Sequence, residues 1–184
     1  MSSSIPFYFL RHGQTQWNKD KIIQGQADSQ LNDEGRAQAL RAAGVLQAEP
    51  VARIIASPLS RTRHTAEAVA ALNGLEIIYD DDLMECHLGD HQGEPYGDWI
   101  PEYWAGKYTP PNGESFHVFC ERVWGAMQNA INLGPNTLIV AHGGLWIAAQ
   151  EYVALKPPMR LPQNALPMAV VQSGGVWGYS ILGA

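Results

Sequence analysis

Two histidines and two arginines in this sequence have the types and spacing needed for phosphoryl transfer. His12 and His142 are each followed by glycine. Arg11 directly precedes His12, and Arg61 lies in a second polar segment. A neutral imidazole nitrogen can act as a nucleophile, and a covalent phosphoryl-enzyme splits one difficult displacement into two easier ones. We therefore expect one histidine to attack phosphorus and the other to hydrogen-bond the transferring group.

The residues beside these histidines favour an anionic ligand. The planar guanidinium of arginine matches phosphate oxygens in a bidentate way and stays charged, so Arg11 and Arg61 could neutralise the equatorial oxygens. Gly13 and Gly143 let the backbone approach closely, and a helix starting at Gly143 would add aligned N–H groups. A carboxylic acid must also protonate the leaving oxygen and later activate water, and Glu85 is the candidate.

Three of the polar segments directly follow predicted strands. The apolar run 7–10 ends at Arg11, the β-branched run 51–56 ends at Ser57, and the run 137–141 ends at His142. Amphipathic patterns predict helices over four segments: 33–47, 60–73, 114–132 and 143 to about 155.

Strands that alternate with helices predict an α/β fold, here a three-layer α/β/α sandwich with a mostly parallel central sheet. In such sheets ligands bind at the carboxyl ends of the strands, so we expect the polar segments to converge there. Further strands are predicted over 75–79, 169–172 and 176–181, and Ser173-Gly174-Gly175 suits a hairpin turn between the last two.

The length and the weakly periodic middle of the chain predict its organisation. With 184 residues the chain is in the range of a single domain, here 1–184. The segment 80–112 is rich in glycine, proline, tryptophan and charge, and we interpret it as an insert that forms a lid over the site.

Composition limits the partners that we expect. The net charge is -6 and no block of lysine or arginine occurs, so neither nucleic acid nor an anionic membrane is an expected partner. The two cysteines, Cys86 and Cys120, do not form a metal-like or redox-like pair. The N-terminus lacks the features of a signal peptide, and no apolar run approaches the roughly 20 residues of a membrane span. A cytoplasmic location is the resulting prediction.

Five segments together resemble one known family. The segment 10–18 (LRHGQTQWN) resembles the opening signature of the histidine phosphatase superfamily, the phosphoglycerate-mutase-like proteins. Four more segments resemble the same family in the same order: 31–39, 57–66, 85–89 and 140–144. The resemblance spans residues 5 to about 150.

This resemblance implies a role for each matching residue and a phosphoglycerate-mutase-like fold. His12 would be the phosphorylated nucleophile, and Glu85 would be the proton donor and acceptor. The other implied site residues are the phosphate pocket of Arg11, Arg61 and His142, and the substrate or phosphate contacts Asn18, Gln24 and Gly25. The resemblance implies neither a metal nor a cofactor.

Departures from the mutases of the family favour hydrolysis. Mutases resemble one another in a tyrosine near the acid and a basic cluster that grips a phosphorylated carboxylic acid. Here Leu88 stands at the tyrosine-like position, and Lys107 is the only lysine or arginine between Arg63 and Arg122. We predict a phosphatase that hydrolyses a small-molecule phosphate monoester through a phosphohistidine, with mutase-type transfer as the alternative.

Other interpretations of the same residues stay open. Asp80-Asp81-Asp82 after a strand resembles the D-x-D of magnesium-dependent phosphatases with an aspartate nucleophile, and His87 and His91 have a spacing found in zinc sites. A non-enzymatic module that binds a phosphorylated ligand is a further alternative. The sequence leaves undetermined whether His87, Glu94 or Glu114 contacts substrate, and which oligomer forms.

Overall fold

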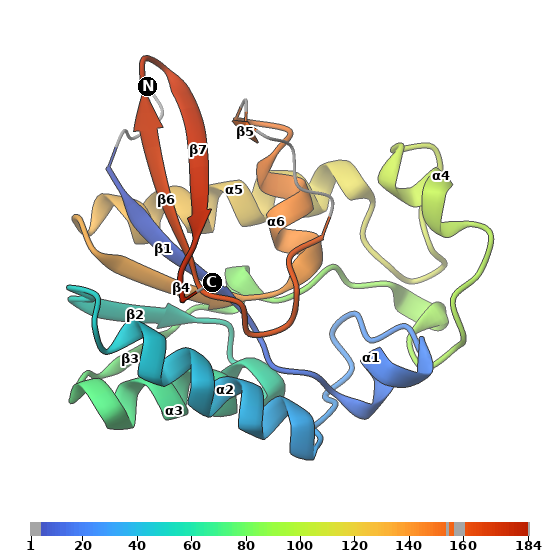
Figure 1. Cartoon of the computed structure of the whole chain (residues 1–184). Helices are drawn as coiled ribbons and strands as arrows, with labels where there is room; N and C mark the ends of the chain where they lie inside the picture. The colour runs from blue at the N-terminus through green and yellow to red at the C-terminus, as the bar shows by residue number, and fades with distance from the viewer. Residues whose placement is uncertain (1–4, 154, 157–160, 184) are drawn as a thin grey trace.

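A computed structural model describes residues 5–153, 155–156 and 161–183 of the chain. Within these residues, seven strands form one sheet in the order β3-β2-β4-β1-β6-β7-β5 (Figure 1). The strands are β1 (Phe7–Arg11), β2 (Arg53–Ala56), β3 (Ile77–Tyr79), β4 (Thr137–Ala141), β5 (Leu155–Lys156), β6 (Met168–Ser173) and β7 (Val176–Ile181).

The half of the sheet that begins at β3 is parallel throughout. Strand β4 pairs with β1 on one side and with β2 on the other, and β3 extends the sheet beyond β2. Strand β6 runs antiparallel to both β1 and β7, and it continues into β7 through Gly174 and Gly175. Both glycines have positive φ, which suits the twist of a two-residue hairpin turn. The prediction of a mostly parallel sheet is therefore confirmed.

Helices cover both faces of this sheet. In Figure 1, α2 and α3 lie on one face, and α5 and α6 lie on the other. The α-helices are α1 (Gln16–Asp20), α2 (Asp33–Leu46), α3 (Ser60–Asn73), α4 (Ile100–Trp104), α5 (Phe116–Asn132) and α6 (Gly143–Ala149). Two 3₁₀ turns, η1 (Asp81–Leu83) and η2 (Gly89–His91), lie between β3 and α4.

The side chains of β1 divide the buried residues into two cores. Because successive side chains of a strand point to opposite faces, Phe7 and Phe9 pack with residues of α5 and α6. Tyr8 and Leu10 pack with residues of α2 and α3 on the other face. A hydrophobic core on each face makes a three-layer α/β/α arrangement, as the sequence predicts.

The ends of two predicted helices are set by polar caps. The Asn32 side chain accepts a hydrogen bond of 2.8 Å from the backbone N–H of Gly35 at the start of α2. The Ser115 side chain accepts one of 3.3 Å from Val118 at the start of α5.

The structure differs from the prediction near α1 and α6. The sequence predicts no helix over 16–20, where the capping box of Thr15 and Asn18 starts a short one. The last predicted helix extends to about residue 155, whereas α6 ends at Ala149. Residue 154 of that predicted helix lies outside the described residues. No helix in the described part of the chain is long and apolar enough to cross a membrane.

Close packing between α2 and the loop after β1 predicts opposite effects of alanine at two glycines of the same helix. A Cβ on Gly35 would collide with the backbone of Gln14, whereas a Cβ on Gly44 would meet nothing within 4 Å. We expect Gly35→Ala to lower the free energy of unfolding by about 1–3 kcal/mol. Gly44→Ala should raise it by about 0.5–1 kcal/mol, since glycine costs helix entropy. Urea unfolding of both variants measures this, and equal effects would contradict it.

Candidate active site

His12 lies directly after β1, with a defined ring orientation. Its backbone N–H donates to the carbonyl of Ala141, and its ring is buried, with the residue 2% exposed. The ring Nδ1 lies 2.7 Å from the carbonyl oxygen of Gly13. Because a carbonyl oxygen only accepts hydrogen bonds, Nδ1 must carry the proton, and the neutral ring then has its free electron pair on Nε2.

His142 follows β4 and lies beside His12. The centroids of the two rings are 5.3 Å apart. The Nε2 atom of His142 lies 2.8 Å from the hydroxyl of Ser57, which follows β2. Since β1, β2 and β4 are parallel and adjacent, their carboxyl ends bring these three residues to one edge of the sheet.

Two buried arginines lie at the same edge. Arg61 donates from Nη2 to the carbonyl of Gly25 at 2.7 Å and from Nη1 to that of Ala27 at 3.0 Å. Arg11 donates from Nη1 to the carbonyl of Pro162 at 2.8 Å. Neither guanidinium forms an ion pair with a carboxylate within the described residues. Carbonyls thus orient both arginines while their positive charges remain uncompensated by a direct partner.

Three buried nitrogens of these side chains have no hydrogen-bond partner within the part of the chain that the structure describes. They are Nε of Arg11, Nε of Arg61 and Nδ1 of His142. Buried polar atoms in proteins are normally paired, and an unpaired cluster suits a ligand. The two guanidinium groups provide the donors that a tetrahedral oxyanion such as phosphate requires.

Burial and the two arginines determine the ionisation of the histidines. Burial lowers the pKa of His12 well below its ordinary value of 6.5, and the charges of Arg61 and Arg11 lower it further. Burial also lowers the pKa of His142 well below 6.5, and the charges of Arg61 and other nearby groups lower it further. Burial lowers the pKa of Arg61 to about 10, which leaves it charged at neutral pH. At neutral pH both imidazoles are therefore neutral beside charged arginines.

Glu85 presents its carboxylate from the loop after η1. Its Oε1 accepts from the backbone N–H of Cys86, and its Oε2 accepts from that of Gly144, both at 3.0 Å. A Cβ on Gly144 would collide with this carboxylate. The second glycine of His142-Gly143-Gly144 is therefore required at this contact. Gly143 had a predicted role and Gly144 had none, although a second glycine directly after a strand was a visible signal.

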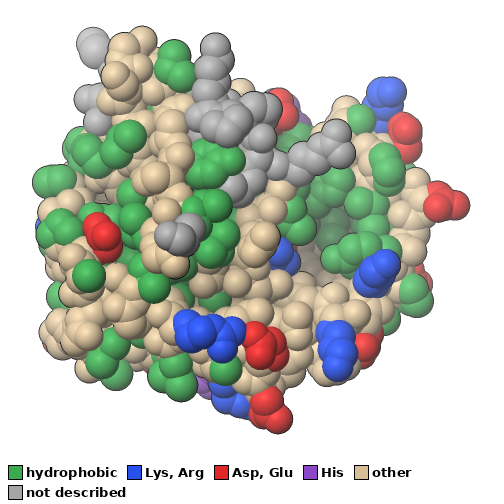
Figure 2. Space-filling view, viewed as in Figure 1, with side chains coloured by type: hydrophobic (Ala, Val, Ile, Leu, Met, Phe, Trp, Pro, Cys, Tyr) green, Lys and Arg blue, Asp and Glu red, His purple; other side chains and the backbone are tan. Residues whose placement is uncertain are grey.

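Arg11, His12, Arg61 and Glu85 border a cavity of about 300 Å³. Figure 2 shows the hollow, with hydrophobic side chains over much of its visible wall. Eight of the ten predicted site residues border it: Arg11, His12, Asn18, Gln24, Gly25, Arg61, Glu85 and Gly143. Its apolar wall includes Leu88, Trp99, Ile100, Trp104 and Ile147. Within the described residues, Arg11 and Arg61 are the only lysines or arginines that border it.

Two predicted site residues do not border the cavity. His142 is fully buried and does not line the cavity, and its ring lies against that of His12. The N–H of Gly13 donates to the hydroxyl of Thr65 at 3.0 Å, and a Cβ on Gly13 would collide with the carbonyl of Gly35. Gly13 therefore permits close packing of the loop against α2 and α3, and its N–H is not directed to a ligand.

The residues of the rival interpretations are placed elsewhere. Asp80 caps η1 by accepting from the N–H of Asp82, at the end of the edge strand β3. His91 contacts the carboxylate of Glu94 and the hydroxyl of Tyr108, at 2.7 Å and 2.8 Å. Among the described residues, no three histidine, cysteine, aspartate or glutamate side chains are grouped as a metal site requires.

The sheet order, with helices on both faces and two histidines at the carboxyl ends of central strands, defines a phosphoglycerate-mutase-like α/β fold. Comparison with known proteins agrees with this class. The model of the histidine phosphatase superfamily (branch 1) matches residues 7–173. The chain therefore belongs to the histidine phosphatase superfamily.

Similar proteins carry two kinds of name. A probable phosphoglycerate mutase GpmB of Cronobacter sakazakii is 38% identical over 152 residues, which cover 76% of this chain and 70% of that protein. A mycobacterial glucosyl-3-phosphoglycerate phosphatase in complex with VO3 has a TM-score of 0.81 and 28% identity, over 98% of this chain and 99% of that one. A phosphoglycerate mutase from Thermus thermophilus has a TM-score of 0.79 and 28% identity, over 98% and 99%.

The lowered histidine pKa values predict a loss of stability in mild acid. Below about pH 6.5 the unfolded chain binds protons at two histidines that the folded protein keeps neutral. The free energy of unfolding should thus decrease as the pH is lowered, by up to about 1.4 kcal/mol per pH unit for each histidine. Urea unfolding between pH 7.5 and pH 5 measures this slope. The double variant His12→Gln/His142→Gln should lose most of it, and an unchanged slope would contradict the prediction.

Proposed function

We propose that this protein is a metal-independent phosphatase that hydrolyses a small-molecule phosphate monoester through a phosphohistidine on His12. The observation that carries the proposal is the free electron pair on Nε2 of His12, beside two buried arginines whose Nε atoms lack partners among the described residues. A neutral nucleophile next to fixed positive charge is the arrangement that attack on a phosphate dianion needs.

In the first step, Nε2 of His12 attacks phosphorus and the bond from phosphorus to the ester oxygen breaks. Arg11 and Arg61 offset the negative charge of the equatorial oxygens, which catalyses the transfer by electrostatic stabilisation. The carboxylic acid of Glu85 gives its proton to the leaving oxygen, so the product departs as a neutral alcohol.

In the second step, water replaces the alcohol. The Glu85 carboxylate takes a proton from this water as the oxygen attacks phosphorus, and the bond from nitrogen to phosphorus breaks. Phosphate leaves and His12 returns to its neutral form. The N–H groups of Cys86 and Gly144 hold the carboxylate at the start of this step.

The cavity wall supports water, rather than a second phosphate ester, as the final acceptor. A mutase must retain a phosphorylated acid while the phosphoryl group moves, and the carboxylate of that acid needs its own cation. Apart from Arg11 and Arg61, the cavity has no lysine or arginine within the described residues. The apolar side chains of Trp99, Ile100 and Trp104 suit a neutral or partly apolar leaving group.

We also propose that the segment 80–112 acts as a lid over the site and that the protein is cytoplasmic.

Replacement of His12 tests the nucleophile. His12→Gln should lower turnover of an aryl phosphate by roughly 10⁴-fold or more, because the imidazole nitrogen forms the covalent bond. The wild-type rate should be unchanged in excess chelator. Rapid quench with radiolabelled substrate should trap acid-labile phosphate on the wild-type chain. Loss of activity on chelation would favour the aspartate-nucleophile mechanism, and no turnover across a phosphoester panel would favour a binding module.

Phosphoglycerate mutase activity is the second candidate function, because several similar proteins are named probable phosphoglycerate mutases. With 3-phosphoglycerate as substrate we expect release of inorganic phosphate to exceed formation of 2-phosphoglycerate. Parallel assays of the two products measure the ratio. Isomerisation well above phosphate release would overturn the phosphatase proposal and establish the mutase.

A further inference from the structure

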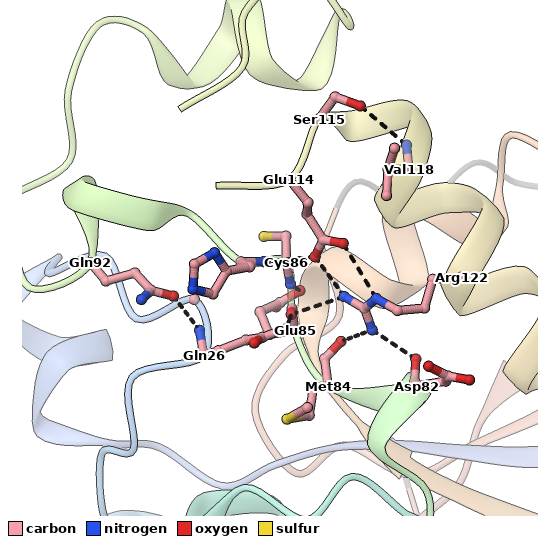
Figure 3. Close-up of polar contacts among 12 residues, drawn as sticks. Gln26, Asp82, Met84, Glu85, Cys86, Gln92, Glu114, Ser115, Val118 and Arg122 are labelled. Atoms are coloured by element: carbon pink, nitrogen blue, oxygen red, sulfur yellow. Dashed lines mark hydrogen bonds and ion pairs between the residues drawn. The ribbon is translucent and has the colours of Figure 1, made fainter. Parts of the chain in front are cut away.

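The loop that carries Glu85 is held by one arginine of α5. The Nη1 atom of Arg122 donates to the carbonyls of Asp82 and Met84 at 2.8 Å and 2.9 Å. Its Nη2 atom donates to the carbonyl of Glu85 at 3.3 Å. Figure 3 shows the guanidinium of Arg122 directed at Asp82, Met84 and Glu85 of this loop. One side chain thus satisfies three carbonyls around the proposed acid.

Glu114, just before α5, completes this arrangement. Its Oε1 accepts from Nη2 of Arg122 at 2.6 Å and its Oε2 accepts from Nε at 3.3 Å, which makes a bidentate pair. The same Oε1 accepts from the backbone N–H of His87 at 2.7 Å. The Arg122 and Glu114 side chains are only 19% and 12% exposed. The pair therefore holds the loop at residues 82, 84, 85 and 87.

Glu114 does not border the cavity, and its two oxygens already have partners. The sequence left open a substrate contact for this residue, and the structure gives it a different environment. Neither Glu114 nor Arg122 touches the carboxylate of Glu85, which the N–H groups of Cys86 and Gly144 hold. The hydrogen bonds of the pair therefore reach this acid through the backbone of the loop.

The Glu85 backbone is also held from the opposite side. The side-chain amide of Gln26 donates to the carbonyl of Glu85 at 3.1 Å, and the backbone N–H of Gln26 donates to the side chain of Gln92 at 2.7 Å (Figure 3). Gln26 lies in the loop that also supplies Gly25 and Ala27 to Arg61. The loop that carries Glu85, called the acid loop below, and Arg61 are thus both hydrogen-bonded to the short segment 25–27.

We propose that Arg122, fixed by Glu114, is the positioning residue that sets the distance between the Glu85 carboxyl and the leaving oxygen. This inference depends on the acid role of Glu85 in the proposed function. Proton transfer needs a heavy-atom separation of about 2.6–3.2 Å. A misplacement of about 1 Å can cost about 10²-fold in rate. Lysine has no planar fork that could reach the carbonyls and Glu114 together.

Leaving groups of different basicity separate positioning from general stability. Phenyl phosphate needs a proton on its departing oxygen, whereas 2,4-dinitrophenyl phosphate releases a stable anion without one. Both leaving groups are aromatic, and because every variant is compared with wild type on the same two substrates, the difference in size between them cancels. The kcat/KM ratio of the two substrates reports only the steps up to departure of the leaving group, so it isolates the acid step.

Arg122→Gln should lower kcat/KM for phenyl phosphate by about 10²-fold and that for 2,4-dinitrophenyl phosphate by less than about threefold. Arg122→Lys should lose nearly as much, and Glu114→Gln should show the same selective loss on a smaller scale. The matched control is Arg41→Gln, an exposed arginine that pairs with Glu34 on α2. This control should leave both values unchanged.

A double variant tests the pathway of the effect. If Arg122 acts through Glu85, then Glu85→Gln/Arg122→Gln should lose no more activity on phenyl phosphate than Glu85→Gln alone. Binding of inorganic phosphate, measured by calorimetry, should stay within about threefold of wild type in Arg122→Gln, because the hydrogen bonds of Arg122 go to the loop and to Glu114 and not to Arg11 or Arg61.

Equal loss on both substrates in Arg122→Gln, or additive loss in the double variant, would overturn the positioning role. If Arg122→Gln does not fold, Glu114→Gln and Arg122→Lys carry the same leaving-group test. Failure of the proposed function looks different. In that case Glu85→Gln itself shows no dependence on the leaving group, or the wild-type protein turns over neither substrate.

Discussion

The uncompensated positive charge of Arg11 and Arg61 is the constraint on which the site depends. Both guanidinium groups are buried and held by carbonyl oxygens rather than by carboxylates. Leaving charge unpaired inside a protein costs free energy, and packing elsewhere must offset that cost. The cores on both faces of the sheet provide that packing. An anion that enters the cavity then finds donors already in place and needs little reorganisation around it.

The same charge determines the state of the neighbouring groups. It acts with burial to lower the pKa of His12, so that the ring stays neutral without a base beside it. It also attracts Glu85, whose charge acts on both arginines. The position of this carboxylate is fixed by backbone groups of two elements, the acid loop and the start of α6. Charge and backbone geometry together therefore place a neutral imidazole and a carboxyl group at one cavity.

The sequence predicted the elements better than the connections between them. Apolar runs and strand ends identified β1, β2 and β4, and the parallel topology then brought Arg11, His12 and His142 to one edge. Helix α1 was missed because it has only five residues and Asn18 stands where the usual capping box has Glu or Gln. The early end of α6 was missed because neither glycine nor proline follows Ala149 before residue 157. The Arg122 contacts were not predictable either. They join a helix to a loop about 40 residues earlier, and no local pattern encodes such a distance.

The position of β4 has a consequence for the order in which this chain folds. Strand β4 is synthesised after β1 and β2 but lies between them in the sheet. The N-terminal part of a chain leaves the ribosome first. When only the first 130 or so residues have emerged, β1 and β2 are both present, but the strand that joins them in the sheet is not. Contacts between segments so far apart along the chain form slowly. The two histidines meet only when β4 inserts, so the nascent chain cannot assemble the candidate site until His142 has emerged, about three-quarters of the way along the chain.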